Sequence, residues 1–255
     1  MKNAAEYVFA AQAASLAYEE KDIAAANPLF KDAEDLLIYN DASAALTARA
    51  YGWVKDRIFF LTFRGTQSRS DMFADADILR TYLFPEGDHS VLVHAGFLSY
   101  YMSLDERIVA DIERNLSSID SIHVMGHSLG GAMATIAAVV LASKFPELRM
   151  VCYTVGSPRV GNAGFVRAFA RLVADSMRIT NSDDPVPRFP ISPFYTHVTG
   201  FLCIDDKCVV TEATVDVSWW RRLFSLPSQI DFKAPIADHS CSLYIERLLT
   251  LVAKA

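Results

Sequence analysis

The residues best placed to do chemistry are a serine and the glycines around it. Residues 126–130 read Gly-His-Ser-Leu-Gly and fit the pattern G-x-S-x-G, with Ser128 at the centre. An apolar segment expected to be a strand precedes the pattern, and a long apolar segment expected to be a helix follows it. In such a strand–turn–helix the serine hydroxyl projects from a sharp turn, where only glycines avoid collisions with neighbouring backbone. Ser128 is therefore the candidate nucleophile, with an ordinary glycine-rich helix start as the alternative.

A serine hydroxyl needs a base that takes its proton and a buried acid that orients the base. Where the chain order is Ser, then acid, then His, the base must follow Ser128, which leaves His197 and His239. His239 is favoured because it lies in a loop before the last expected helix and leaves room for an acid upstream. His127 is adjacent to the nucleophile in sequence, and we expect a packed, hydrogen-bonded histidine there, with substrate contact as the alternative.

Two neighbouring aspartates, Asp183 and Asp184, compete for the role of the acid. Both follow an expected strand, and Pro185 and Pro187 stiffen the same loop, which helps to hold a carboxylate still. The residues alone leave this choice open. For the developing oxyanion, the residue after the nucleophile is the expected backbone donor, here Leu129.

The elements that must position these residues alternate between strand and helix. Strands are expected at residues 46–53, 57–63, 119–125, 149–155 and 176–180, with a hairpin at 198–204 and 208–211. Helices are expected at residues 4–20, 98–116, 128–145, 165–173 and 240–253. This alternation predicts an α/β fold with a mostly parallel central sheet flanked by helices on both faces. No repeat or long linker divides the chain, so residues 1–255 are expected to form a single domain.

The composition excludes several classes of protein. The 255 residues carry a net charge of −6, with 52% hydrophobic and 21% charged residues, which is too apolar for a disordered chain. No clustered basic face is apparent, so no nucleic-acid partner is expected. The uncharged run at residues 128–143 is shorter than the roughly 20 residues of a membrane-spanning helix, so no transmembrane segment is expected. The high proportion of apolar residues then indicates a large core, together with an apolar surface that contacts an apolar partner.

The N-terminal segment and the cysteines bear on the compartment. Glu6 and Gln12 interrupt the Ala-rich start, which favours an amphipathic helix with Tyr7, Ala11, Ala14 and Tyr18 on one side over a signal peptide. A cytoplasmic location or a leaderless route of secretion is therefore expected. Cys203 and Cys208 flank an expected hairpin turn and either form a disulfide or stay reduced, and the second alternative is slightly favoured.

Five ordered blocks resemble the class 3 lipases, the fungal-type triacylglycerol lipase family of the α/β-hydrolases. They are Phe-Arg-Gly-Thr at 63–66, Val-His-Ala-Gly-Phe at 93–97, the serine block at 124–132, Val-Gly-Ser-Pro-Arg-Val-Gly-Asn at 155–162 and Asp-Pro-Val-Pro-Arg at 184–188. The resemblance implies an α/β-hydrolase fold with a short lid after the first oxyanion loop. It also implies Asp184 as the acid, His239 as the base and Thr66 as the second oxyanion donor.

The resemblance places the lid at residues 67–75. Met72 stands where the family often carries Trp, and Met72 and Phe73 are expected to form an apolar lid face that contacts substrate. Asp75 resembles the aspartate that braces the oxyanion loop. Residues 78–84 are expected either to pack in the core or to contact substrate, and residues 219–224 either to crown the acyl pocket or to lie at a lipid–water interface.

Together these features predict a serine carboxylic-ester hydrolase that acts on lipid esters through a Ser-His-Asp triad and an acyl-enzyme, without a metal or an organic cofactor. Alternatives are a phospholipase of the A type, a feruloyl or short-chain esterase, and a non-catalytic binding protein with the same fold. The expected partner is a lipid or another apolar ester, met at a lipid–water interface. The sequence does not determine the oligomeric state.

Overall fold

The computed structural model describes residues 4–30, 33–41, 47–66, 79–181, 184–190, 194–205, 210–213 and 238–254. Its centre is an eight-stranded sheet with the order β1-β2-β3-β6-β7-β8-β9-β10. The strands are β1 (Glu34–Asn40), β2 (Arg49–Lys55), β3 (Ile58–Phe63), β6 (Ser121–His127), β7 (Arg149–Val155), β8 (Asp175–Asn181), β9 (Phe201–Ile204) and β10 (Val210–Ala213). The five strands from β3 to β9 run parallel, and the outer strands pair antiparallel.

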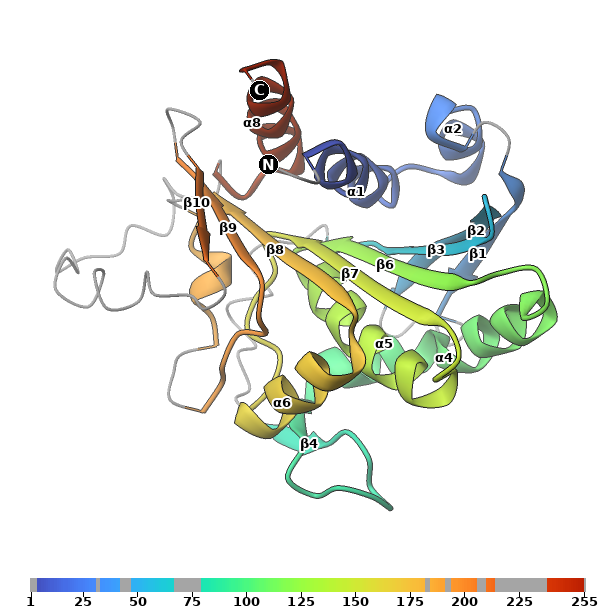
Figure 1. The fold of residues 1–255 in the computed structure, drawn as a ribbon, viewed down its shortest axis with the longest axis vertical. Helices are drawn as coiled ribbons and strands as arrows, with labels where there is room; N and C mark the ends of the chain where they lie inside the picture. The colour runs from blue at the N-terminus through green and yellow to red at the C-terminus, as the bar shows by residue number, and fades with distance from the viewer. Residues whose placement is uncertain are drawn as a thin grey trace, which may run out of the picture.

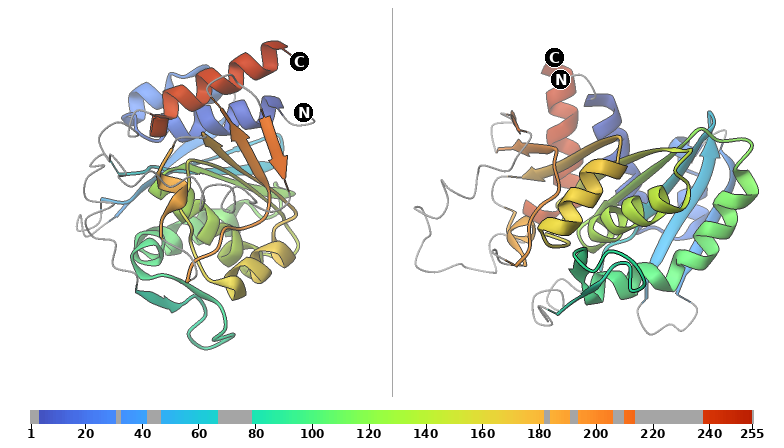
Figure 2. Two further views of the ribbon diagram at one scale, coloured as in Figure 1. Left: turned by 90° about the vertical axis from the view of Figure 1, so that its left-hand side faces the viewer. Right: turned by 60° about the horizontal axis from the view of Figure 1, so that its bottom comes forward.

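Helices cover both faces of this sheet. The N-terminal α1 (Ala4–Leu16) and the C-terminal α8 (Cys241–Lys254) lie side by side on one face, as Figures 1 and 2 show. The opposite face carries α4 (Ala95–Asn115), α5 (Leu129–Lys144) and α6 (Ala163–Leu172) (Figure 1). Shorter elements are α2 (Lys21–Ala25), the 3₁₀ turns η1 (Pro28–Phe30) and η2 (Val186–Arg188), and the two-stranded ladder of β4 (Arg80–Tyr82) with β5 (Leu92–His94). The predicted α/β fold with its mostly parallel central sheet is confirmed.

In the central sheet, strands β1 and β2 depart furthest from the sequence prediction. Strand β1 was not predicted, because its residues Glu-Asp-Leu-Leu-Ile-Tyr-Asn show no regular alternation; antiparallel pairing with β2 makes it a strand. Strand β2 begins at Arg49 and continues to Lys55, two residues further than expected. The chain then turns through Asp56 and Arg57, with positive φ angles of 51° and 62°, and enters β3.

The longest uncharged segment becomes the central helix of the core. Most of α5 is buried, between the sheet on one side and helices α4 and α6 on the other. A helix enclosed by its neighbours has no polar face to present, which explains why the segment carries no charge before Lys144. Among the described helices, none combines the length and apolarity that crossing a membrane requires.

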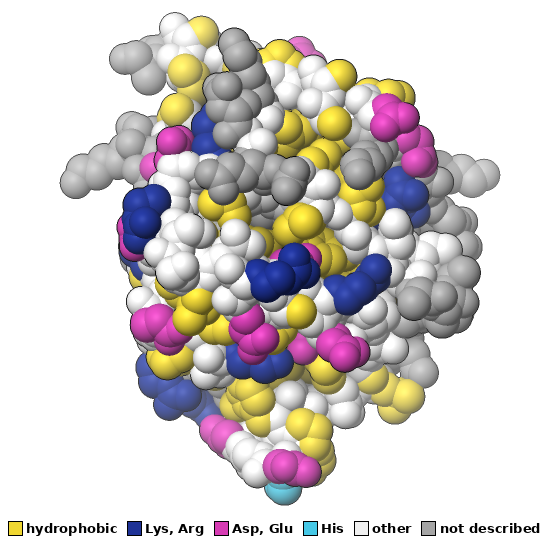
Figure 3. Space-filling view, turned by 90° about the vertical axis from the view of Figure 1, so that its right-hand side faces the viewer, with side chains coloured by type: hydrophobic (Ala, Val, Ile, Leu, Met, Phe, Trp, Pro, Cys, Tyr) yellow, Lys and Arg dark blue, Asp and Glu magenta, His cyan; other side chains and the backbone are white. Residues whose placement is uncertain are grey.

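The surface in Figure 3 carries charges of both signs. On this face, Lys and Arg side chains of the described residues lie among Asp and Glu side chains, with hydrophobic side chains between them (Figure 3). A nucleic-acid-binding face would instead carry a cluster of Lys and Arg side chains with few acidic residues among them. This face therefore has the character of an ordinary solvated surface.

Several residues named in the sequence analysis lie outside the described residues. They are Met72, Phe73, Asp75, Ile78, Asp183, Cys208 and residues 219–224. The lid at residues 67–75, the role of residues 219–224 and the choice between a disulfide and reduced thiols at Cys203 and Cys208 therefore stay as expected from the sequence alone.

Candidate active site

The turn between β6 and α5 holds Ser128 in a strained conformation. Its φ and ψ are 59° and −129°, in a region that non-glycine residues rarely adopt. Its N–H donates to the carbonyl oxygen of Val155 at 3.0 Å, which ties the turn to the end of β7. A Cβ atom at Gly126 would lie 2.2 Å from the Gly130 oxygen, and one at Gly130 would lie 2.1 Å from the Phe63 oxygen. The backbone can pass this closely only because both residues are glycines.

Two backbone segments meet beside Ser128 where an oxyanion would be stabilised. The N–H groups of Gly131 and Ala132 donate to the Ser128 carbonyl at 2.9 and 3.2 Å, so they begin the helical bonding of α5. Leu129 occupies the first helical position, where an N–H has no intrahelical acceptor and the helix dipole favours negative charge. On the other side, a Cβ atom at Gly65 would lie 3.2 Å from the Ser128 Cβ, so the segment that leads into Thr66 packs directly against the turn.

A buried carboxylate and a buried imidazole form the second half of the site. Asp184 is 1% exposed and His239 is 4% exposed. His239 Nδ1 lies 2.8 Å from Asp184 Oδ2. Because a carboxylate accepts, Nδ1 carries the proton, and Nε2 is then the basic nitrogen of a neutral ring. His239 Nε2 is buried and has no hydrogen-bond partner among the described residues, so it is available to a reacting hydroxyl.

The sheet brings these residues together. Ser128 follows β6, and Asp184 follows β8, two positions along the same row of parallel strands. Ligands and reacting groups in open α/β sheets gather outside the carboxyl ends of the strands. Between them, at the end of β7, Gly156 has a φ of 57°, and a Cβ atom there would lie 3.0 Å from both Asp184 Oδ2 and His239 Cε1. His239 comes from the last turn before α8.

Tyr244 is a further partner of the carboxylate that sequence reasoning missed. Its hydroxyl donates to Asp184 Oδ2 at 2.6 Å and accepts the Asn181 N–H at 2.9 Å. Burial first, and the Asp184 charge second, raise the pKa of Tyr244 well above its ordinary value, so the phenol stays protonated and donates. The only available signal was its position in the first turn of the last helix, five residues after His239, which by itself identifies no role.

The other two histidines of the sequence argument occupy different places. His197 Nε2 lies 2.6 Å from the carbonyl oxygen of Pro187, in the turn that follows Asp184. Burial lowers the pKa of His197 well below its ordinary value, and Arg178 and Arg159 lower it further. His197 thus supports the acid loop. His127 is 5% exposed and its ring nitrogens contact Tyr18 and the His239 backbone, which are the contacts of a packed histidine.

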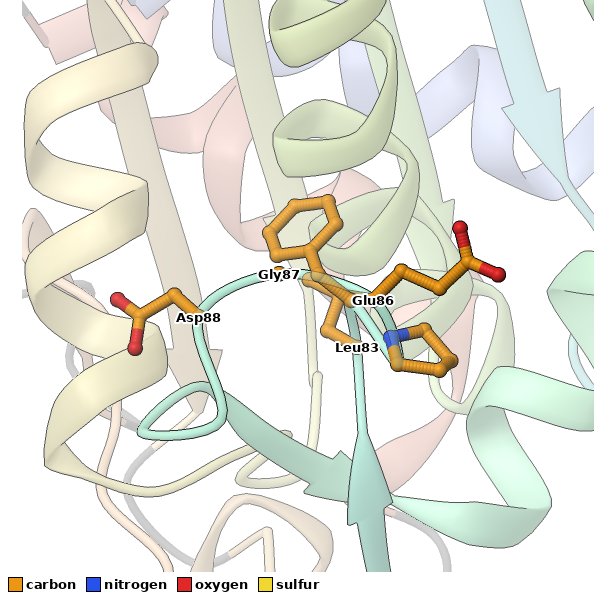
Figure 4. Close-up of a pocket in the computed structure, with 6 residues that line it drawn as sticks. Leu83, Glu86, Gly87 and Asp88 are labelled. Carbon is orange, nitrogen blue, oxygen red and sulfur yellow. The ribbon is translucent and has the colours of Figure 1, made fainter.

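One open pocket lies elsewhere on the described surface. It is lined by residues 83–88, in the loop that joins β4 to β5 (Figure 4). Glu86 and Asp88 point to opposite sides of this loop and do not converge on a common point (Figure 4). The pocket shares no residue with Ser128, Asp184 or His239. Within the described ranges, no three His, Cys, Asp or Glu side chains are grouped so that they could hold a metal ion.

Comparison with known proteins gives a consistent result. A family model described as "Lipase (class 3)" matches residues 60–194, more than half of the chain. The chain is 32% identical over 161 residues to the secreted mono- and diacylglycerol lipase A of Penicillium cyclopium, which covers 62% of this chain and 51% of that protein. It is 40% identical over 131 residues to the secreted mono- and diacylglycerol lipase 1 of Fusarium solani, covering 48% and 37%.

The chain thus spans about half the length, or less, of these two relatives. A solved structure of the triacylglyceride lipase of Rhizomucor miehei is similar in fold, with a TM-score of 0.77 and 22% sequence identity over 93% of both chains.

Proposed function

The chain belongs to the class 3 lipase family, and on that basis we propose that it is a serine carboxylic-ester hydrolase acting on lipid esters. The observation that carries the proposal is the buried hydrogen bond between His239 Nδ1 and Asp184 Oδ2, on the same sheet edge as the strained Ser128. In the proposed triad Ser128 is the nucleophile, His239 the base and Asp184 the acid. Thr66 and Leu129 supply the oxyanion donors.

The reaction follows from this arrangement in two steps. His239 Nε2 takes the Ser128 hydroxyl proton as Oγ attacks the ester carbonyl, and the backbone N–H groups of Leu129 and Thr66 bind the developing oxyanion. His239 then gives its proton to the leaving alcohol, and an acyl-Ser128 ester remains. Water, deprotonated by the same nitrogen, attacks that ester; the bond to Ser128 Oγ breaks, His239 returns the proton to Oγ, and the carboxylic acid is released. Asp184 holds the ring in the required tautomer throughout.

An exposed apolar patch supports a lipid as the substrate class. Leu79, Tyr82 and Phe194 are 61%, 46% and 55% exposed, and the Arg80 guanidinium lies 5.5 Å from the centre of the Phe194 ring. Aromatic rings with a neighbouring cation suit the headgroup level of a lipid–water interface. We propose that this patch contacts the surface on which the ester substrate is presented.

The decisive test measures hydrolysis by the full chain and by Ser128→Ala. With p-nitrophenyl esters of increasing chain length, the wild-type protein is expected to prefer longer acyl chains. Ser128→Ala is expected to lower kcat at least about 1,000-fold, because the nucleophile of a triad is removed. A serine-directed phosphonate should label the wild-type protein and not Ser128→Ala.

Ser143→Ala is the matched control, since Ser143 lies near the far end of the same helix and its hydroxyl donates to the Val139 carbonyl. Its activity should equal that of the wild type. Full activity of Ser128→Ala would overturn the proposal. Parallel assays on acylglycerol emulsions, phospholipid vesicles and feruloyl esters then distinguish the substrate classes. A preference for feruloyl esters would replace the lipid-ester assignment.

A further inference from the structure

The backbone that carries the base is held by side chains from the strands of the nucleophile and the acid. His239 lies in a single 3₁₀ turn between residues outside the described ranges and the start of α8. The Asn181 side-chain amide, at the end of β8, donates to the Asp238 carbonyl at 2.9 Å. His127 Nε2, at the end of β6, lies 2.8 Å from the His239 carbonyl oxygen. Two successive carbonyl groups are therefore bound from two different strands.

The contacts of His127 define which of its nitrogens donates. A carbonyl oxygen only accepts, so Nε2 of His127 carries a proton and donates to His239. The second ring nitrogen, Nδ1, lies 2.9 Å from the Tyr18 hydroxyl. In the neutral ring Nδ1 is an acceptor, so the Tyr18 hydroxyl donates to it. The result is a pair of hydrogen bonds in series: the Tyr18 hydroxyl donates to the His127 ring, and the His127 ring donates to the His239 carbonyl oxygen.

The His127 ring also packs against the ring of the base. The His127 and His239 ring centres lie 4.5 Å apart with an interplanar angle of 31°, and the Tyr18 ring centre lies 6.0 Å from that of His127. A Cβ atom at Gly65 would lie 2.2 Å from the Tyr18 hydroxyl and 2.8 Å from the His127 carbonyl oxygen. The Tyr18 hydroxyl therefore lies at the junction of the nucleophile turn, the base support and the segment that leads to Thr66.

We propose that His127, held by Tyr18, is a positioning residue for the base: its Nε2–H binds the His239 carbonyl and keeps the imidazole of His239 at the distance from Ser128 that proton transfer requires. The proposal rests on the proposed function, since it assigns His239 as the base. A reacting pair needs close placement, and a shift of about 1 Å can reduce the rate roughly 100-fold. A base in a short turn, outside regular secondary structure, depends on such external hydrogen bonds for its placement.

The first experiment compares three variants of the full chain for kcat and KM on one soluble p-nitrophenyl ester. His127→Phe keeps a ring of similar size but removes both hydrogen bonds, and it is expected to lower kcat about 10- to 100-fold with KM changed less than about threefold. His127→Gln places an amide N–H near the position of Nε2 and should recover most of that loss. His123→Phe is the matched control, because His123 lies four residues earlier on the same strand and packs edge-to-face against Phe60. Its kcat should stay within about twofold of the wild type.

A double-mutant cycle tests whether Tyr18 acts through His127. Tyr18→Phe removes one hydroxyl and is expected to lower kcat about 2- to 10-fold in the wild-type background. In the His127→Phe background the same change should have no further effect on kcat, because the ring nitrogen that it contacts is gone. Should His127→Phe fail to fold, Tyr18→Phe and His127→Gln carry the test by themselves: a Tyr18→Phe kcat equal to that of the wild type would then overturn the proposal.

The outcomes separate this inference from the proposed function. If the wild-type protein neither hydrolyses esters nor reacts with the phosphonate, the proposed function fails and the inference falls with it. An active wild type together with a His127→Phe kcat within about twofold of it overturns the inference alone. The same holds if kcat and KM both deteriorate with a lower unfolding midpoint and His127→Gln recovers nothing, because that pattern marks a purely structural histidine.

Discussion

Among the described residues, three groups donate hydrogen bonds to Asp184: one from its own loop and two from the C-terminal segment. The Val186 N–H donates to Oδ1 at 2.9 Å, while Oδ2 receives the Tyr244 hydroxyl at 2.6 Å and His239 Nδ1 at 2.8 Å. At the scale of single residues, the orientation of the proposed acid is thus determined before any substrate binds. Such preorganisation spares the reaction the cost of arranging its dipoles as charge develops.

Because Tyr244 and His239 both donate to Asp184 Oδ2, we expect Tyr244 to affect both the stability of the protein and its rate of ester hydrolysis. Tyr244→Phe removes one donor to Asp184 and leaves the buried Asn181 N–H without its acceptor, which should cost about 1–3 kcal/mol of unfolding free energy. The less constrained carboxylate should also lower kcat. Urea denaturation and ester kinetics measure the two effects.

Tyr101→Phe is the matched control, because Tyr101 is also a buried tyrosine whose hydroxyl donates to a carboxylate, here Asp105. It should reduce stability and leave kcat unchanged. If both variants lose stability equally and neither loses activity, Tyr244 has no part in the function.

At the scale of elements, the site depends on the pair of terminal helices. The C-terminal helix α8 begins two residues after His239 and supplies Tyr244, and it packs against α1. Helix α1 is rich in alanine on its buried side, with Ala10, Ala11, Ala13 and Ala14 all 0% exposed. Small side chains allow α1 to approach both α8 and the sheet closely, and the Ala13 carbonyl accepts the Thr62 hydroxyl at 3.2 Å. The placement of the base therefore depends on a helix far from it in the sequence.

A larger side chain on the buried side of α1 should disturb this packing. Ala11 is the test position, because its carbonyl lies 3.5 Å from Cys241 Sγ at the start of α8. Ala11→Leu is expected to lower the unfolding free energy by about 1–3 kcal/mol through overpacking, and to lower kcat by shifting α8. Ala5→Leu, on the exposed side of the same helix, should change neither quantity. Equal behaviour of the two variants in denaturation and kinetics would show that α1 does not constrain α8.

At the scale of the whole molecule, the apolar excess is divided between core and surface. Two clusters of buried side chains, one on each face of the sheet, contain the buried apolar residues of the strands and of α1, α4, α5 and α8. The exposed Leu79, Tyr82 and Phe194 account for part of the remainder. Polar groups enclosed in such a molecule tend to be neutral, because burial disfavours the charged form.

Two histidines make stability dependent on pH. Burial, with Arg149 as a second cause, lowers the pKa of His123 to about 4, and the pKa of His197 is also lowered. The unfolded chain takes up these protons near pH 6.5, whereas the folded protein does not, so acidification below about pH 6.5 favours unfolding. Each histidine should contribute less than about 1.4 kcal/mol per pH unit, the limit for one proton.

The urea concentration at the unfolding midpoint should therefore decrease as the pH is lowered from 7 to 5. His123→Phe should flatten that dependence, since it removes one of the two groups. A midpoint that stays constant over this range would contradict the prediction, as would an unchanged slope in the variant.

Local features of the sequence determined the class of fold and the position of the nucleophile. Hydrophobic patterns predicted the parallel strands and α5 because they reflect which side of each element is buried. The glycines around Ser128 marked the sharp turn because backbone sterics act over a few residues. The family blocks then selected Asp184 over Asp183 and named Thr66, although Asp183 itself lies outside the described residues.

The tertiary structure alone decided which distant side chains support the site. Tyr18 and His127 are 109 positions apart, His127 and His239 are 112 apart, and Asp184 and Tyr244 are 60 apart. A hydrogen bond depends on distance and direction within a few tenths of an ångström, and no local pattern encodes which remote residue arrives at that place. Strand β1 was missed for the same reason, since its pairing with β2 and not its own periodicity makes it a strand. Local sterics and burial can be read along the chain, whereas partners exist only once the chain has folded.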